Sequence, residues 1–163
     1  MRNQSRPTPE QALQKIKHYC AYQERCHAET IDKLYSMGLF KKEVDAILCT
    51  LIEENFLNEA RFASEFASGK FRNKRWGKIK IKHALKAKKV SNYLIAEALA
   101  GIDESAYLHT LTQLAEKKWG LLQSQHQSAN TLVQQVAITQ YLLQKGYELS
   151  LIQPIVRQLP LLQ

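Results

Sequence analysis

One register of apolar residues recurs three times along this 163-residue chain, and it limits the possible folds more than any other feature. Without internal gaps, the aligned triplets are Leu34, Leu85 and Leu142; Leu39, Val90 and Tyr147; Val44, Ile95 and Ile152; Ile47, Ala98 and Ile155; Leu48, Leu99 and Val156; and Leu51, Ile102 and Leu159. The steps of three and four residues indicate helices. Each unit is predicted to be a helix, a short turn and a second helix, preceded by a further helix. Units this small complete their cores by stacking on a neighbour.

Helix start and stop signals divide the chain in the same way. Thr8-Pro9-Glu10-Gln11 has the pattern of a capping box with proline at the first helical position, and Asn58 can cap a later helix. The first predicted helix begins at Pro9, and a later one follows the cap at Asn58. The other predicted helices span 27–37, 41–54, 75–88, 92–100 and 103–122. A polar loop at 123–130 and two more helices come after them. The predicted domains are a flexible tail at 1–8, repeat 1 at 9–57, repeat 2 at 58–102 and repeat 3 at 103–163. The fold class is therefore all-α, with three tandem three-helix (helix-turn-helix-like) repeats forming an elongated curved array.

The composition supports a folded, intracellular chain. Hydrophobic residues make up 45% of it, enough for a core, and 6 Gly and 4 Pro are few for the many turns of a β fold. The three cysteines are an odd number without framework spacing, as expected for reduced thiols. No apolar run approaches the ~20 residues of a membrane span, and the amino terminus lacks an apolar signal region. We therefore expect a cytoplasmic protein with no membrane contact.

Positive charge is concentrated in one segment. The net charge is +8, and ten Lys or Arg lie between Lys70 and Lys89, with no Asp or Glu from Phe66 to Ala96. The rest of the chain is thus close to neutral, at about −2. A local basic block without interleaved acids favours a polyanionic or acidic partner over a merely solvated helix face.

At 3.6 residues per turn, the predicted helix of the basic block presents a stripe of cations beside its Ile81–Leu85 core face, formed by Arg75, Lys78, Lys82, Lys86 and Lys89. The candidate partner- or DNA-binding residues are Lys74, Arg75, Lys78, Lys82, Lys86 and Lys89, together with Trp76 and Ile79. Trp76, Ile79 and His83 share a further face, with two alternatives open. They pack on the preceding helix near Phe66 or Phe71, or they form an apolar anchor beside the stripe.

Other functions are disfavoured. The third helix of each unit carries few cations, and Glu43, Asp45, Glu53 and Glu54 make the first one acidic. Sequence-specific reading of the DNA major groove is therefore not expected. The chain has no phosphate-binding Gly-rich loop and no catalytic motif, and His18 and Cys20 lack the spacing of zinc ligands. We predict no enzyme activity, no cofactor and no metal.

Three strings resemble the RecX family of regulatory proteins, bacterial modulators of the RecA recombinase. They are FLNEARFA from Phe56 to Ala63; KRWGKIKI from Lys74 to Ile81, continued by Ala84, Leu85 and Val90; and RCHAE from Arg25 to Glu29, continued by Leu34 and Gly38. The resemblance extends over about Ala12 to Ile102. Lys89 stands where the family usually has Gly, and Asn58 where it often has Asp.

The resemblance implies a three-repeat, all-α protein that lodges in the groove of the RecA–DNA filament. Such proteins inhibit filament extension, ATP hydrolysis, strand exchange and co-protease activity. The expected partners are the RecA recombinase filament and, through weak non-specific contacts, single- or double-stranded DNA, with the chain acting as a monomer. The alternative function is that of a non-specific DNA-binding architectural or regulatory protein without a recombinase partner.

Overall fold

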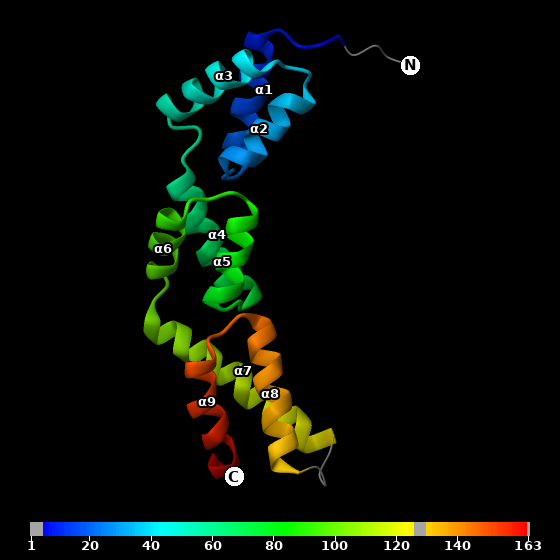
Figure 1. Cartoon of the computed structure of the whole chain (residues 1–163), viewed down its shortest axis with the longest axis vertical. Coiled ribbons are helices and arrows are strands. Elements are labelled where there is room, and N and C mark those ends of the chain that lie inside the picture. Colours follow the sequence, from blue (N-terminus) through cyan, green and yellow to red (C-terminus); the bar gives the residue numbers. More distant parts are fainter. Residues whose placement is uncertain (1–4, 126–129, 163) are drawn as a thin grey trace. The chain divides into compact units, whose positions relative to one another are not determined.

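A computed structural model describes residues 5–125 and 130–162 of the chain (Figure 1). This part of the chain is helical throughout and contains no strand, which confirms the all-α prediction. Its nine α-helices are α1 (Pro9–Tyr22), α2 (His27–Ser36), α3 (Lys41–Glu53), α4 (Glu59–Lys74), α5 (Lys78–Ala87), α6 (Asn92–Ala100), α7 (Glu104–Gln125), α8 (Thr131–Lys145) and α9 (Leu149–Gln158), followed by a short 3-10 turn, Leu159–Leu162. Within these ranges, no helix is long and apolar enough to cross a lipid bilayer.

The chain forms two compact units. Unit 1 extends to Phe66 and also takes Leu85–Ala98, whereas unit 2 consists of Ala67–Ala84 and the chain from Leu99 onward. Helices α4, α5 and α6 each contribute residues to both units. The domain boundaries inferred from the sequence repeat, and the elongated curved arrangement of the repeats, therefore stay predictions.

The repeat register is confirmed by burial. Leu34, Leu85 and Leu142 are each 0% exposed. The other aligned triplets that are buried throughout are Leu39, Val90 and Tyr147; Val44, Ile95 and Ile152; and Leu51, Ile102 and Leu159. In each of the three repeats, large apolar side chains at these positions are removed from water, and this removal is the main favourable term in helix packing.

The turn that follows each of these leucines has the same backbone conformation. Gly38 has φ +86°, Lys89 has φ +62° and Gly146 has φ +95°, and the three residues are equivalent in the repeat. A left-handed residue after a helix satisfies its last carbonyl groups, and glycine adopts it without strain. The middle repeat therefore has the same turn as the other two repeats, but Lys89 adopts it at a steric cost that Gly38 and Gly146 avoid.

Unit 1 is built on α1, α2 and α3, whose inward faces share one core. Thr8 caps α1 through its side chain, with Gln11 returning the bond, as the sequence predicts. Arg6 binds Glu43 of α3 and lies over the Phe40 ring, so this part of the predicted flexible tail contacts the first module. Residues 1–4 of that tail lie outside the described residues.

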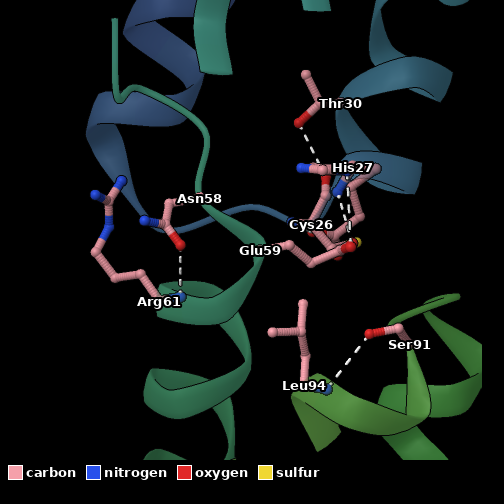
Figure 2. Close-up of polar contacts among 9 residues, drawn as sticks. Cys26, His27, Thr30, Asn58, Glu59, Arg61, Ser91 and Leu94 are labelled. Atoms are coloured by element: carbon pink, nitrogen blue, oxygen red, sulfur yellow. Dashed lines mark hydrogen bonds and ion pairs between the residues drawn. The ribbon is translucent and has the colours of Figure 1, made fainter. Parts of the chain in front are cut away.

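The amino ends of α2, α4 and α6 are fixed by side-chain contacts within unit 1 (Figure 2). Asn58 accepts a hydrogen bond from the Arg61 N–H (2.9 Å), and Ser91 accepts one from the Leu94 N–H (3.3 Å). The Glu59 carboxylate accepts from the His27 N–H (3.2 Å), so the first turn of α4 also holds the first turn of α2. These contacts confirm the predicted cap at Asn58 and satisfy amides that a helix end leaves unpaired.

Two predicted element boundaries are wrong. Helix α4 continues to Lys74 and α5 begins at Lys78, whereas a helix from about Arg75 was predicted. Arg75 lies between them with φ +54°, a left-handed conformation that no helix contains. Residues 123–125 of the predicted polar loop belong to α7 and Asn130 caps α8, while 126–129 lie outside the described residues.

Candidate binding site on the central basic segment

The turn before α5 is anchored to the turn after α8, both within unit 2. The Gly77 N–H donates to the Lys145 carbonyl (2.8 Å), and the Ile79 N–H donates to the Gly146 carbonyl (3.0 Å). A Cβ on Gly77 would lie under 3.0 Å from the backbone of Gly146 and Tyr147. Only a glycine permits this backbone approach.

A buried tyrosine pair stabilises the same junction. The Tyr107 hydroxyl donates to the Glu148 carboxylate (2.6 Å) and accepts from the Lys78 N–H (2.9 Å). The Tyr147 hydroxyl donates to the Arg75 carbonyl (3.0 Å), and the two rings lie 5.0 Å apart. Burial raises the pKa of both hydroxyls above the ordinary value, and the Glu148 carboxylate raises that of Tyr107 further. Both phenols therefore stay neutral donors, and they fix the position of Arg75.

The structure changes the stripe of cations that the sequence predicts. Both ends of the stripe, Arg75 and Lys89, have left-handed backbones outside α5, so only Lys78, Lys82 and Lys86 share one face of that helix. Lys78 is not free, because its ammonium binds Glu104 (2.8 Å) and lies over the Tyr107 ring (4.7 Å). Its side chain is only 20% exposed.

The remaining predicted cations are accessible. In unit 2, Lys74, Arg75 and Lys82 are exposed, and in unit 1 so are Lys86 and Lys89. None of these five forms an ion pair with an acidic residue of the described chain. Accessible cations without acidic neighbours are available to an external anion.

One more lysine of the basic block is used internally. The Lys88 ammonium binds Glu29 in unit 1 and lies 5.9 Å from the centre of the Phe62 ring. Burial alone would raise the pKa of the Glu29 carboxyl, but hydrogen bonds from Lys88 and from the Cys26 N–H hold it below the ordinary value. Lys88 therefore contributes to the packing of α2 and α5.

Trp76 and Ile79, the two predicted apolar binding residues, differ in their surroundings. The Trp76 ring is half-buried, with the Lys70 ammonium 5.0 Å and the Lys80 ammonium 4.7 Å from it. Trp76 thus packs against a cation of the preceding helix, α4, and against one of α5. Ile79 is 41% exposed and His83 is also exposed.

The sequence prediction missed cations that approach Arg75 from distant parts of the chain. Lys117 and Lys118 on α7 and Lys145 on α8 line one hollow with Arg75 in unit 2. Leu114, Lys117, Lys118 and Leu121 have the spacing of a single helix face, as do Tyr141 and Lys145. This spacing was the signal available in the sequence, although it does not show that the two faces meet.

Comparison with known proteins identifies the family. Residues 58–99 match the sequence model of the RecX second three-helix domain. The regulatory protein RecX of Clostridium perfringens strain SM101 is 32% identical over 131 residues, 80% of this chain and 60% of that protein. The chain belongs to the RecX family. RecX of Lacticaseibacillus paracasei is 25% identical over 138 residues, 85% of this chain and 56% of that protein. The chain thus spans somewhat under two thirds of the length of these relatives.

Solved RecX structures share the fold. The crystal structure of RecX from Lactobacillus salivarius superposes with a TM-score of 0.83 at 24% identity, covering 94% of this chain and 97% of that one. A second RecX crystal structure gives a TM-score of 0.76 at 18% identity, covering 90% of this chain and 72% of the other. The relatives are named as regulatory proteins, in agreement with the prediction that this chain is not an enzyme.

Proposed function

We propose that this RecX family member binds the RecA filament on DNA and inhibits the recombinase, acting on filament extension, ATP hydrolysis, strand exchange and co-protease activity. The proposal is supported by the family to which the chain belongs and by the charge of its central segment. Contact with DNA inside the filament is weak and independent of sequence, and the chain acts as a monomer.

The observation that carries the proposal is the set of free cations in the α5 segment, Lys82, Lys86 and Lys89. All three are exposed, and none is paired with an acid in the described chain. They lie within residues 58–99, the part that matches the RecX domain model. Charge complementarity of this kind steers association and favours partners with acidic or phosphate surfaces.

The test is the RecA ATPase on single-stranded DNA, measured with the protein at substoichiometric amounts. The α5 variant carries Lys82→Gln, Lys86→Gln and Lys89→Gln. The control variant, Lys15→Gln, Lys42→Gln and Arg157→Gln, loses the same charge from exposed residues that form no ion pair in the described chain. Both variants should melt like the parent, because unpaired exposed cations contribute little to stability.

We expect the parent and the control to inhibit the ATPase and the α5 variant to inhibit at least tenfold less per molecule, the effect of roughly 1.4 kcal/mol in binding. Equal loss in both variants would mean that only bulk charge matters. If neither variant is impaired, the contact is apolar, and Ile79 and Trp76 are the residues to replace. If the parent binds DNA and leaves the ATPase unchanged, the architectural DNA-binding alternative is correct.

A further inference from the structure

Unit 2 contains a basic hollow, of about 340 Å³, that shares Arg75, but none of its lysines, with the predicted stripe. Its cations are Arg75, Lys117, Lys118 and Lys145, and the ring of Tyr141 forms part of its wall. Among the described residues, no Asp or Glu lines it. The four cations come from the α4–α5 turn, from α7 and from α8, so the hollow exists only because the tertiary fold brings these elements together.

Arg75 is held at the edge of the hollow by its own backbone. Its left-handed conformation turns the chain between α4 and α5, and its carbonyl accepts the Tyr147 hydroxyl. The guanidinium itself is exposed and forms no ion pair within the described residues. A planar guanidinium on a fixed backbone is suited to two parallel hydrogen bonds with a phosphate.

The lysines of the hollow are likewise without an acidic partner in the described chain. Lys118 and Lys145 have their ammonium groups 5.2 Å and 6.0 Å from the centre of the Tyr141 ring, and the Lys145 ammonium is 3.5 Å from the Lys74 carbonyl oxygen. Four cations in one concavity repel each other, and a bound anion relieves that repulsion.

A second, smaller hollow of about 170 Å³ is lined by Lys80, Tyr141, Gln144 and Lys145. Tyr141 and Lys145 are common to both. A ligand that carries anions at intervals can therefore place one in each hollow, which a single phosphate ion cannot do. An aromatic ring and leucines beside a track of cations are typical of sites for single-stranded nucleic acids, whose bases lie on the apolar surface.

We propose that this hollow binds the phosphodiester backbone of a single-stranded nucleic acid, with Arg75, Lys117, Lys118 and Lys145 contacting phosphates. The inference rests on the proposed function only in that a strand is within reach when the protein is bound to a recombinase filament. It assigns direct contact with the strand to the third repeat and the α4–α5 turn, where the sequence assigned it to the α5 stripe.

The experiment measures fluorescence anisotropy of a labelled oligothymidylate with the full chain and no recombinase. The hollow variant carries Lys117→Gln, Lys118→Gln and Lys145→Gln. It is compared with the Lys82, Lys86 and Lys89 variant and with the Lys15, Lys42 and Arg157 control, each of which loses three charges. Because Lys118 and Lys145 are both half-buried, a double variant of the two exposed cations, Arg75→Gln with Lys117→Gln, keeps the test valid if the triple variant melts early.

The hollow variant should bind about tenfold more weakly, and its log–log salt slope should be shallower by roughly 2, since each phosphate contact on a single strand contributes about −0.7. The other two variants should stay within about twofold of the parent. Equal weakening in all three variants, or an unchanged hollow variant, would overturn the proposal. Displacement of the strand by poly-glutamate at equal charge concentration would also overturn it, because it would indicate an acidic protein ligand. The same holds if the hollow variant loses binding to duplex DNA as strongly as it loses binding to the single strand.

The outcome is separable from that of the proposed function. If the parent leaves the RecA ATPase unchanged but only the hollow variant loses the oligonucleotide, the inhibitor proposal fails and the phosphate site stands. If the hollow variant binds the oligonucleotide as the parent does and the parent still inhibits the ATPase, the phosphate site fails and the inhibitor proposal stands.

Discussion

Gly77 and Gly146 approach each other backbone to backbone, and neither position has room for a side chain. A Cβ on Gly77 would overlap the Gly146 carbonyl, and a Cβ on Gly146 would overlap the backbone and Cβ of Lys80, each at less than 3.0 Å. Two backbone hydrogen bonds, from Gly77 to Lys145 and from Ile79 to Gly146, are formed across this contact. The position of the Arg75 turn against α8 therefore depends on two hydrogen atoms where other residues carry carbon.

Replacing Gly77 by alanine should destabilise the protein by about 3 kcal/mol, because overpacking against backbone forces the two segments apart. Urea unfolding followed by circular dichroism measures the change. The matched controls are Gly69→Ala in α4 and Gly120→Ala in α7, where an added Cβ meets nothing within 4 Å. Both controls should stabilise by about 0.5–1 kcal/mol, since alanine is the better helix former. A neutral Gly77→Ala would show that the junction is not closely packed.

The left-handed turn at Lys89 predicts a stabilising substitution. Lys89→Gly should raise stability by about 0.5–1 kcal/mol, because glycine adopts φ +62° without strain, although it also gains freedom in the unfolded chain. The equivalent Gly38, at φ +86°, should respond in the opposite direction when replaced by alanine. Thermal melts of the two variants give the comparison, and a lower melting temperature for Lys89→Gly would contradict the strain argument.

The sequence predicted the repeat and most helix ends because those properties are local. Burial of Leu34, Leu85 and Leu142 follows from helical spacing, and the caps at Thr8 and Asn58 follow from side chains that bond amides three residues away. The helix start at Arg75 was predicted wrongly because lysine and arginine are good helix formers. The left-handed turn there is imposed by two hydrogen bonds, one from Gly77 to Lys145 and one from Tyr147 to Arg75. Each joins residues that lie about seventy positions apart in the sequence.

The candidate site was less predictable for the same reason. A helical wheel groups Lys78 with Lys82, but it cannot show that Glu104, 26 residues later, neutralises Lys78. In the sequence, Lys117 and Lys118 lie outside the basic block, whereas the fold brings them to Arg75 and Lys145.

The repeat predicts equal costs at equivalent core positions. Leu34→Ala, Leu85→Ala and Leu142→Ala should each destabilise by about 2–5 kcal/mol, the range for a fully buried leucine that leaves a cavity. Leu132, 67% exposed on α8, is the control, and its replacement by alanine should cost less than about 0.5 kcal/mol. Denaturant midpoints measure the four values. A cost at Leu85 similar to that at Leu132 would contradict the equivalence of the middle unit.

The three free cysteines should differ in reactivity. Cys20 and Cys26 are buried, and that burial raises the pKa of both thiols, whereas Cys49 is exposed. Because the thiolate is the reactive form, a thiol reagent such as DTNB at pH 8 should label Cys49 rapidly and the other two at least tenfold more slowly. Denaturant should release all three. Rapid labelling of three thiols in the native protein would mean that the α1–α2 core opens readily.

The pair formed by Lys88 and Glu29 predicts a pH-dependent contribution to stability. Burial opposes ionisation of Glu29, but Lys88 and the Cys26 N–H outweigh it, so the folded pKa lies below the unfolded value of about 4.3. The stabilisation is therefore complete above the unfolded pKa and is lost as the pH falls through the folded pKa.

Lys88→Gln should accordingly cost about 0.5–1 kcal/mol at pH 7, a value typical of an ion pair that is still partly exposed, and progressively less between about pH 5 and pH 3. Urea unfolding at several pH values measures this difference. Lys86→Gln is the matched control, since Lys86 lies two positions earlier, is exposed and pairs with no acid of the described residues, so its effect should be small at every pH. A penalty for Lys88→Gln that does not change with pH would have another origin, the loss of contact between the lysine and the rings of Phe62 and Phe66, which lie 5.9 Å and 5.8 Å from its ammonium.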